Sequence, residues 1–169
     1  MAITPAKSSD IPELVDLVNS AYRGEGAKQG WTTEADLIDG TRTDIGSLTE
    51  ELNGPAVTML KNTDDNGRIT GCVFLQKRGE KLYLGMLTVS PTLQAKGLGK
   101  QLLQAAEDFG REHGLNCMTM TVITKREELI AFYERRGYAK TGEVISFTIP
   151  EHNGVAKEPL EMYKLEKSL

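Results

Sequence analysis

The sequence of 169 residues predicts an α/β domain built on a mixed sheet, because two hydrophobic periodicities alternate along it. Apolar residues three and four positions apart, typical of helices, alternate with short apolar runs typical of strands. Glycines and polar turns separate these segments, and no repeat, low-complexity tract or linker marks a domain boundary. We therefore expect residues 1–169 to form one domain, in the order strand, helices, three strands, helix, strand, helix, two strands.

The N-terminal part carries one well-marked helix. Asp10 can cap it, Glu13 follows three residues later as in a capping box, and Pro12 is tolerated in the first turn. Two shorter helices are expected at 33–39 and 44–52, within a glycine-rich segment that is typical of a lid or a substrate-facing region. The apolar face of the first helix consists of Ile11, Leu14, Val15, Val18 and Tyr22.

From Pro55 onward the pattern changes to that of strands. Turn signals at 64–67 and 78–80 divide the first three strands into an antiparallel meander. Gly114 and Gly137 end the two helices that follow. The expected strands are 56–61, 69–75, 82–89, 115–123, 139–148 and 160–166, and the expected helices are 97–113 and 127–136.

Composition narrows the class of function. A formal net charge of -4 gives no general attraction for phosphate backbones, so we expect no nucleic-acid partner and a mild preference for cationic substrates. Neither a membrane-spanning apolar run nor a signal peptide is present, which predicts a soluble, cytoplasmic protein with no membrane partner. Cys72 and Cys117 lie in apolar runs and are expected to be reduced core residues. The sequence has no cluster of cysteines and histidines that could hold a metal ion, so we expect no metal.

A glycine-containing loop precedes the helix expected at 97–113. Gly97 and Gly99 would let the backbone approach a ligand, and the unpaired amides of a first helical turn attract anions such as a pyrophosphate. A tight turn without a ligand explains the same glycines. The spacing of the glycines and Lys100 disfavours a Walker loop, and Leu102 stands where the dinucleotide fingerprint requires its third glycine.

Two segments resemble motifs of the GNAT superfamily of acetyl-CoA-dependent N-acyltransferases. The stretch 87–103, which contains Gln-Ala-Lys-Gly-Leu-Gly-Lys, is similar to its motif A, and Phe-Tyr-Glu-Arg-Arg-Gly-Tyr at 132–138 is similar to its second signature. The resemblance implies the GNAT fold. That fold has a mostly antiparallel sheet of about six to seven strands, splayed in the middle and flanked by about four helices.

The resemblance also implies residue roles. The backbone of Leu87, Thr88 and Val89 would hold the pantetheine arm of acetyl-CoA. Tyr133 would protonate the departing thiolate, although an aromatic on that helix face is also explained by packing. The residues implied to wrap the pyrophosphate are Gln94, Ala95, Lys96, Gly97, Leu98, Gly99 and Lys100.

The chain also departs from the pattern of its relatives. Tyr83 stands where some relatives place a glutamate base, which leaves a water chain or a carboxylate such as Glu34 for that role. Glu34 is equally explained as a first-turn helix carboxylate. Arg126 replaces an asparagine common among relatives and would either reach the coenzyme or remain solvated. By the same resemblance, Trp31, Glu34, Arg42 and Tyr83 are candidates to contact the acceptor.

Together these observations predict an enzyme that transfers an acetyl group from acetyl-CoA to a primary amine of a small molecule or protein. The amine would attack directly in a ternary complex. A sensor that binds acyl-CoA without turnover is the main alternative, and the resemblance also allows a homodimer. A domain that has lost coenzyme binding is disfavoured by the intact loop at 94–99.

Overall fold

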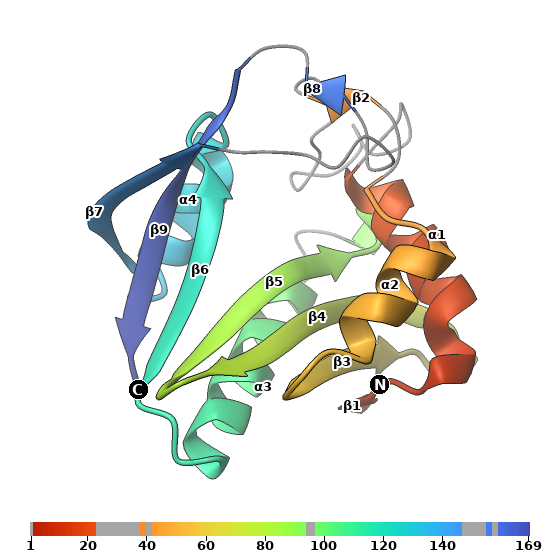
Figure 1. The fold of residues 1–169 in the computed structure, drawn as a ribbon. Coiled ribbons are helices and arrows are strands. Elements are labelled where there is room, and N and C mark those ends of the chain that lie inside the picture. Colours follow the sequence, from red (N-terminus) through yellow and green to blue (C-terminus); the bar gives the residue numbers. More distant parts are fainter. Residues whose placement is uncertain (1, 23–37, 40–41, 94–96, 147–154, 157–158) are drawn as a thin grey trace.

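The computed structural model describes residues 2–22, 38–39, 42–93, 97–146, 155–156 and 159–169. Its main feature is a seven-stranded sheet with the order β1-β3-β4-β5-β6-β9-β7, shown in Figure 1. All neighbouring strands are antiparallel except β5 and β6, so the predicted mixed, mostly antiparallel sheet is confirmed. The strands are β1 (Ala2–Pro5), β3 (Val57–Thr63), β4 (Ile69–Arg78), β5 (Lys81–Val89), β6 (Cys117–Ile123), β7 (Ala139–Ser146) and β9 (Glu161–Ser168).

Helices cover both faces of this sheet. On one face, α1 (Ile11–Tyr22) and α2 (Ile45–Leu52) pack in a core that includes Leu14, Val18 and Leu48. On the other, α3 (Leu98–Glu112) and α4 (Glu127–Glu134) pack in a second core around Leu102 and Met118. Single 3-10 turns, η1 (Ser8–Asp10) and η3 (Pro91–Leu93), precede α1 and follow β5. Burial of apolar side chains on both faces holds the helices against the sheet.

The sheet divides between β5 and β6. These two strands pair only where 81–83 lie beside 117–119, although β5 continues to Val89 and β6 continues to Ile123. Beyond that short parallel ladder β5 leaves β6, whereas β6 remains paired with β9 over its whole length. Figure 1 shows the resulting V between the two halves of the sheet. The splayed sheet implied by the resemblance is therefore present.

Three local expectations need correction. Glu13 makes no capping box, because its carboxylate accepts the Ile69 amide at 2.7 Å, and it is the Asp10 carboxylate that accepts the Lys7 amide, at 2.8 Å, at the start of η1. The expected helix at 33–39 is wrong at its end, because β2 (Ile38–Asp39) pairs there with β8 (Val155–Ala156). The remaining residues of that expected helix, 33–37, lie outside the described residues.

The third correction concerns the cysteines. Cys72 is a fully buried free thiol, as expected, whereas Cys117 is free but only half-buried, because it begins β6 at the end of the sheet.

Candidate active site

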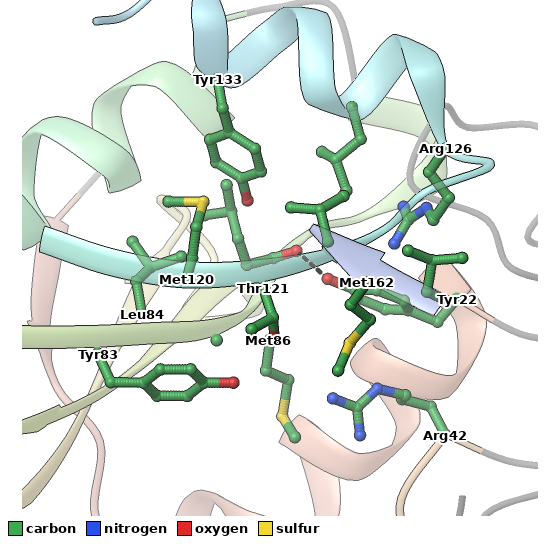
Figure 2. A pocket seen from close by; sticks show the side chains of 15 residues that line it. Tyr22, Arg42, Tyr83, Leu84, Met86, Met120, Thr121, Arg126, Tyr133 and Met162 are labelled. Carbon is green, nitrogen blue, oxygen red and sulfur yellow. Dashed lines mark hydrogen bonds between the residues drawn. The ribbon is translucent and has the colours of Figure 1, made fainter. Parts of the chain in front are cut away.

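A pocket of about 180 Å³ lies where β5 and β6 separate. Figure 2 shows side chains from both diverging strands, from α1 and from α4 pointing into it. The strands contribute small and apolar groups, whereas the helices and loops contribute most of the polar ones. The lining residues are Tyr22, Arg42, Tyr83, Leu84, Gly85, Met86, Leu87, Met120, Thr121, Val122, Ile123, Arg126, Leu129, Tyr133 and Met162.

A β-bulge in β5 produces the opening. The register with β4 shifts between Cys72 and Phe74, and Met86 has a φ of 53°, a left-handed conformation that is strained for a residue with a side chain. A bulge bends its strand and increases the local twist, which directs the end of β5 away from β6. The strain thus occurs at the wall of the pocket, where it shapes the site.

The bulge also decides which backbone groups face the opening. The Ser90 amide donates to the Thr70 carbonyl, and hydrogen-bonding residues alternate along an antiparallel strand, so Thr88 bonds toward β4. Leu87 and Val89 consequently turn toward the gap. Of the three residues expected to hold the pantetheine arm through the backbone, Thr88 is therefore oriented away from it.

Tyr22, at the end of α1, fixes the strand at this point. Its hydroxyl donates to the Leu87 carbonyl at 2.6 Å, and its side chain is buried. The sequence pattern assigned Tyr22 only to the core face of the helix. Its buried hydroxyl was the signal that could have identified it, because such a group requires a polar partner.

Tyr133 enters the pocket from α4. Its side chain is 4% exposed, and Figure 2 shows the hydroxyl directed into the cavity. Burial raises the pKa of Tyr133 well above its usual range, and the positive charge of Arg126 opposes that shift. The phenol is therefore fully protonated near neutral pH, the state required of a proton donor.

Tyr138 and a partly buried ion pair, between Lys167 and Glu107, support the Tyr133 ring. The two tyrosine rings meet edge to face at 5.7 Å, and the Tyr138 hydroxyl donates to Glu107 at 3.0 Å. Lys167 donates to the other carboxylate oxygen of Glu107 at 2.8 Å. Because Glu107 is buried and fully partnered, this cluster gives Tyr133 a fixed wall to pack against.

The N-terminus of α3 follows the end of β5. Gly97 is its N-cap with a φ of 84°, a conformation that glycine adopts without strain. The first bond back into the helix is from the Gln101 amide to the Gly97 carbonyl, which leaves the amides of Leu98, Gly99 and Lys100 without partners inside the helix. Amides in this arrangement, together with the helix dipole, favour a negatively charged group.

Two arginines that line the pocket lie near the ring of Tyr22. The guanidinium carbons of Arg42 and Arg126 lie 5.7 and 5.4 Å from the centre of the Tyr22 ring, which Figure 2 shows between them. Tyr83 also lines the pocket, with the Arg78 guanidinium 3.9 Å above its ring. The structure thus places Arg42, Tyr83, Arg126 and Tyr133 in one cavity.

Other expected site residues fall outside the described part of the chain: Trp31, Glu34, Gln94, Ala95 and Lys96. Among the described residues, no carboxylate lines the pocket. The charged residues of the described lining, Arg42 and Arg126, are positive, whereas the chain as a whole has a negative net charge. The described residues also contain no cluster of three potential metal ligands. None of the helices in the described ranges is long and apolar enough to cross a bilayer.

Comparison with known proteins relates the sequence of this chain to acetyltransferases. Residues 13–138 match the family model of the acetyltransferase (GNAT) family. A mycothiol acetyltransferase of Clavibacter michiganensis is 28% identical over 138 residues, which are 82% of this chain but only 42% of that relative. An uncharacterized N-acetyltransferase of Bacillus subtilis is 27% identical over 144 residues, 82% of this chain and 89% of the relative.

Solved structures agree in fold. The ribosomal-protein-S18-alanine N-acetyltransferase of Escherichia coli superposes with a TM-score of 0.73 at 16% identity, over 99% of this chain and 92% of that one. At this identity the likeness concerns the fold alone. The sheet that parts between β5 and β6, together with a family match that extends from α1 to the end of the second signature, shows that the chain belongs to the GNAT family of N-acetyltransferases.

Proposed function

We propose that this acetyltransferase moves an acetyl group from acetyl-CoA to a primary amine of a small molecule or protein, by direct attack in a ternary complex. One observation carries the proposal. The hydroxyl of Tyr133 lies in the pocket between β5 and β6 that Leu87 also lines. A proton donor and an exposed strand edge in one small cavity are the two features that breaking a thioester requires.

The chain offers acetyl-CoA two points of attachment. The free amides at the start of α3 suit a diphosphate, and the positive φ of Gly97 lets the chain enter the helix without a side chain over them. The edge of β5 near Leu87, beyond its short ladder with β6, suits an extended amide-containing arm, which would add to the sheet as a further strand does. We expect Lys100, which is exposed in the first turn of α3, to add a positive charge.

Acetyl-CoA supplies the acetyl group as a thioester, whose carbon–sulfur bond breaks when the amine nitrogen bonds to the carbonyl carbon. In our proposal the Leu87 amide polarises that carbonyl, and Tyr133 donates its proton to the departing sulfur. The attacking nitrogen releases one proton to solvent, from which Tyr133 is reprotonated. Burial raises the pKa of Tyr133, so the phenol carries its proton near neutral pH, as this role requires.

Removal of the proton from the amine needs no carboxylate in the described lining. Two guanidiniums beside the acceptor disfavour a third positive charge, so they lower the pKa of a bound ammonium group. The neutral amine is the nucleophile, and its proton can pass to water. The arginines thus supply by electrostatics part of what a glutamate at position 83 supplies in some relatives.

The test is thiol release from acetyl-CoA with a panel of primary amines, with calorimetry of acetyl-CoA binding measured alongside it. Direct attack predicts thiol release that depends on the amine and initial-rate lines that intersect. Parallel lines would indicate a covalent acetyl-enzyme and contradict the ternary complex. Tight binding of acetyl-CoA without release by any amine would instead identify a sensor.

A further inference from the structure

Gly85 lies in the middle of β5, next to the bulge, and forms part of the pocket wall. Glycine weakens the interior of a strand, because it has no side chain to pack and loses more backbone freedom on folding than other residues. The φ of Gly85 is not positive, unlike that of Gly97, so the backbone conformation does not require a glycine here. The glycine is therefore explained by the space around it.

The ring of Tyr83 occupies that space. A Cβ atom on Gly85 would lie 3.0 Å from Cε1 and 3.2 Å from the hydroxyl oxygen of Tyr83. The two residues are two positions apart on one strand, so their side chains belong to the same face of the sheet, and the tyrosine ring lies along the strand over the glycine. A side chain at position 85 would displace the ring, and the hydroxyl with it, by a few tenths of an ångström.

Two further side chains hold the Tyr83 ring. The guanidinium carbon of Arg78 lies 3.9 Å from the ring centre, and the Phe74 ring meets it edge to face at 6.3 Å. Arg78 is itself fixed, because its Nε donates to the side chain of Gln76 at 2.9 Å. The ring thus has contacts on its face, on its edge and against the strand, so its orientation is set before a ligand binds.

The Tyr83 hydroxyl is directed into the pocket, as Figure 2 shows, and has no hydrogen-bond partner among the residues that the structure describes. Tyr83 packs against the core under α1 and α2, whereas Tyr133 belongs to the core under α3 and α4. The two hydroxyls therefore enter one cavity from opposite faces of the sheet. Burial is the main cause of the raised pKa of Tyr133, and Tyr83 contributes to it, which agrees with this placement.

We propose that Gly85 is a positioning residue, which leaves room for the Tyr83 ring to lie where its hydroxyl accepts a hydrogen bond from the amine that attacks the thioester. This inference rests on the proposed acetyl transfer and adds a substrate contact to it. A phenol oxygen accepts such a bond while its own proton is donated to water. With one N–H group held by Tyr83, the lone pair of the nitrogen is directed toward the carbonyl carbon.

This hydrogen bond strengthens as the reaction proceeds. When the nitrogen bonds to the carbonyl carbon it becomes positively charged, and hydrogen bonds from a charged donor are about twice as strong as those between neutral groups. An interaction that is stronger in the transition state than in the ground state raises kcat and has little effect on KM. The nitrogen then releases its proton to water, and Tyr83 keeps its own proton throughout.

The test measures initial rates of thiol release for Tyr83→Phe, Gly85→Ala and the double variant, with the primary amine of the panel that wild type uses fastest. Tyr83→Phe keeps the ring and should lower kcat about tenfold to a hundredfold, with KM for the amine nearly unchanged, as loss of a charge-assisted hydrogen bond predicts. Gly85→Ala should also lower kcat, because it displaces the hydroxyl. In the Tyr83→Phe background, Gly85→Ala should have little further effect on kcat, since the displaced hydroxyl is already absent.

The chain offers a matched control for each substitution. Tyr163→Phe removes a hydroxyl from a tyrosine outside the pocket lining. Gly46→Ala adds a methyl group in α2, where the nearest atom to the new Cβ is Oδ1 of Asp44 at 3.4 Å, an ordinary contact. Both controls should leave kcat unchanged. Circular dichroism and calorimetry of acetyl-CoA binding show for each variant that the fold and the coenzyme site are retained.

Equal kcat values for wild type and Tyr83→Phe would overturn the inference, as would an equal loss from Gly85→Ala in both backgrounds, which would show that the added methyl group acts without the hydroxyl. A Tyr83→Phe variant that changes only KM would also contradict it. Tyr83→Phe decides the role of the hydroxyl by itself if Gly85→Ala does not fold. Absence of thiol release from wild type with every amine would refute the proposed acetyl transfer and this inference with it.

Discussion

Tyr22→Phe tests whether α1 fixes the strand that lines the active site. The substitution removes one hydroxyl from a buried ring and leaves the Leu87 carbonyl without its 2.6 Å donor, while the volume of the side chain hardly changes. A buried polar group that loses its partner costs about 1–3 kcal/mol. We therefore expect a loss of about 2 kcal/mol in the free energy of unfolding, or a fall in Tm of about 4–8 °C for a chain of this length.

Urea unfolding followed by circular dichroism measures this loss as a lower midpoint at an unchanged slope. Tyr163→Phe is the control, because it makes the same chemical change at a half-buried ring whose hydroxyl has no hydrogen-bond partner among the described residues. We also expect Tyr22→Phe to weaken acetyl-CoA binding, since Leu87 is freed to move. Two variants of equal stability would refute the role assigned to the Tyr22 hydroxyl.

Three further predictions follow from the site and the core. Gly97→Val, which forces a β-branched residue to a φ of 84°, should weaken acetyl-CoA binding at least about tenfold in calorimetry, whereas Gly67→Val, at a φ of 80° in a distant turn, should cost stability alone. Equal affinities would contradict the assignment of the loop. Tyr133→Phe should lower kcat about a hundredfold or more and change the Kd of acetyl-CoA much less, and unaltered turnover would remove Tyr133 from the mechanism. Burial raises the pKa of Cys72 to about 12, whereas the same thiol in the unfolded chain has a pKa of about 9. Below about pH 9 the thiol is neutral in both states and the folded protein keeps its full stability. As the pH rises from about 9 toward 12, the thiol ionises in the unfolded chain first, so the free energy of unfolding falls. Wild type should therefore lose more stability than Cys72→Ala between about pH 8 and about pH 11, and parallel losses would contradict this.

Long periodic segments were predicted well from the sequence. The expected helices at 97–113 and 127–136 and the expected strand at 82–89 match α3, α4 and β5 to within a few residues, because each buries an apolar face that the local pattern records. The pair β2–β8 was missed, since strands of two residues carry no periodicity. Glu13 was assigned to a capping box from spacing alone, but a tertiary partner, the Ile69 amide, takes its carboxylate.

The candidate site was only partly predictable. The motif resemblance selected Gly97 and Tyr133 because their roles depend on a local helix start and a helix face. The meeting of Arg42 and Arg126 on Tyr22 depends on how α1, the segment before α2 and the end of β6 pack together, which no local pattern records. The orientation of Thr88 depends likewise on the register of β4 with β5. These features emerge only from the tertiary structure.

We propose that the start of α3 holds a diphosphate and thereby sets a thioester beside Tyr133. A crystal structure of the protein with bound CoA measures this most directly. We expect phosphate oxygens within hydrogen-bond distance of the amides of Leu98, Gly99 and Lys100, and the CoA sulfur within hydrogen-bond distance of the Tyr133 hydroxyl. Density for the diphosphate away from α3, or a sulfur outside the gap between β5 and β6, would contradict it.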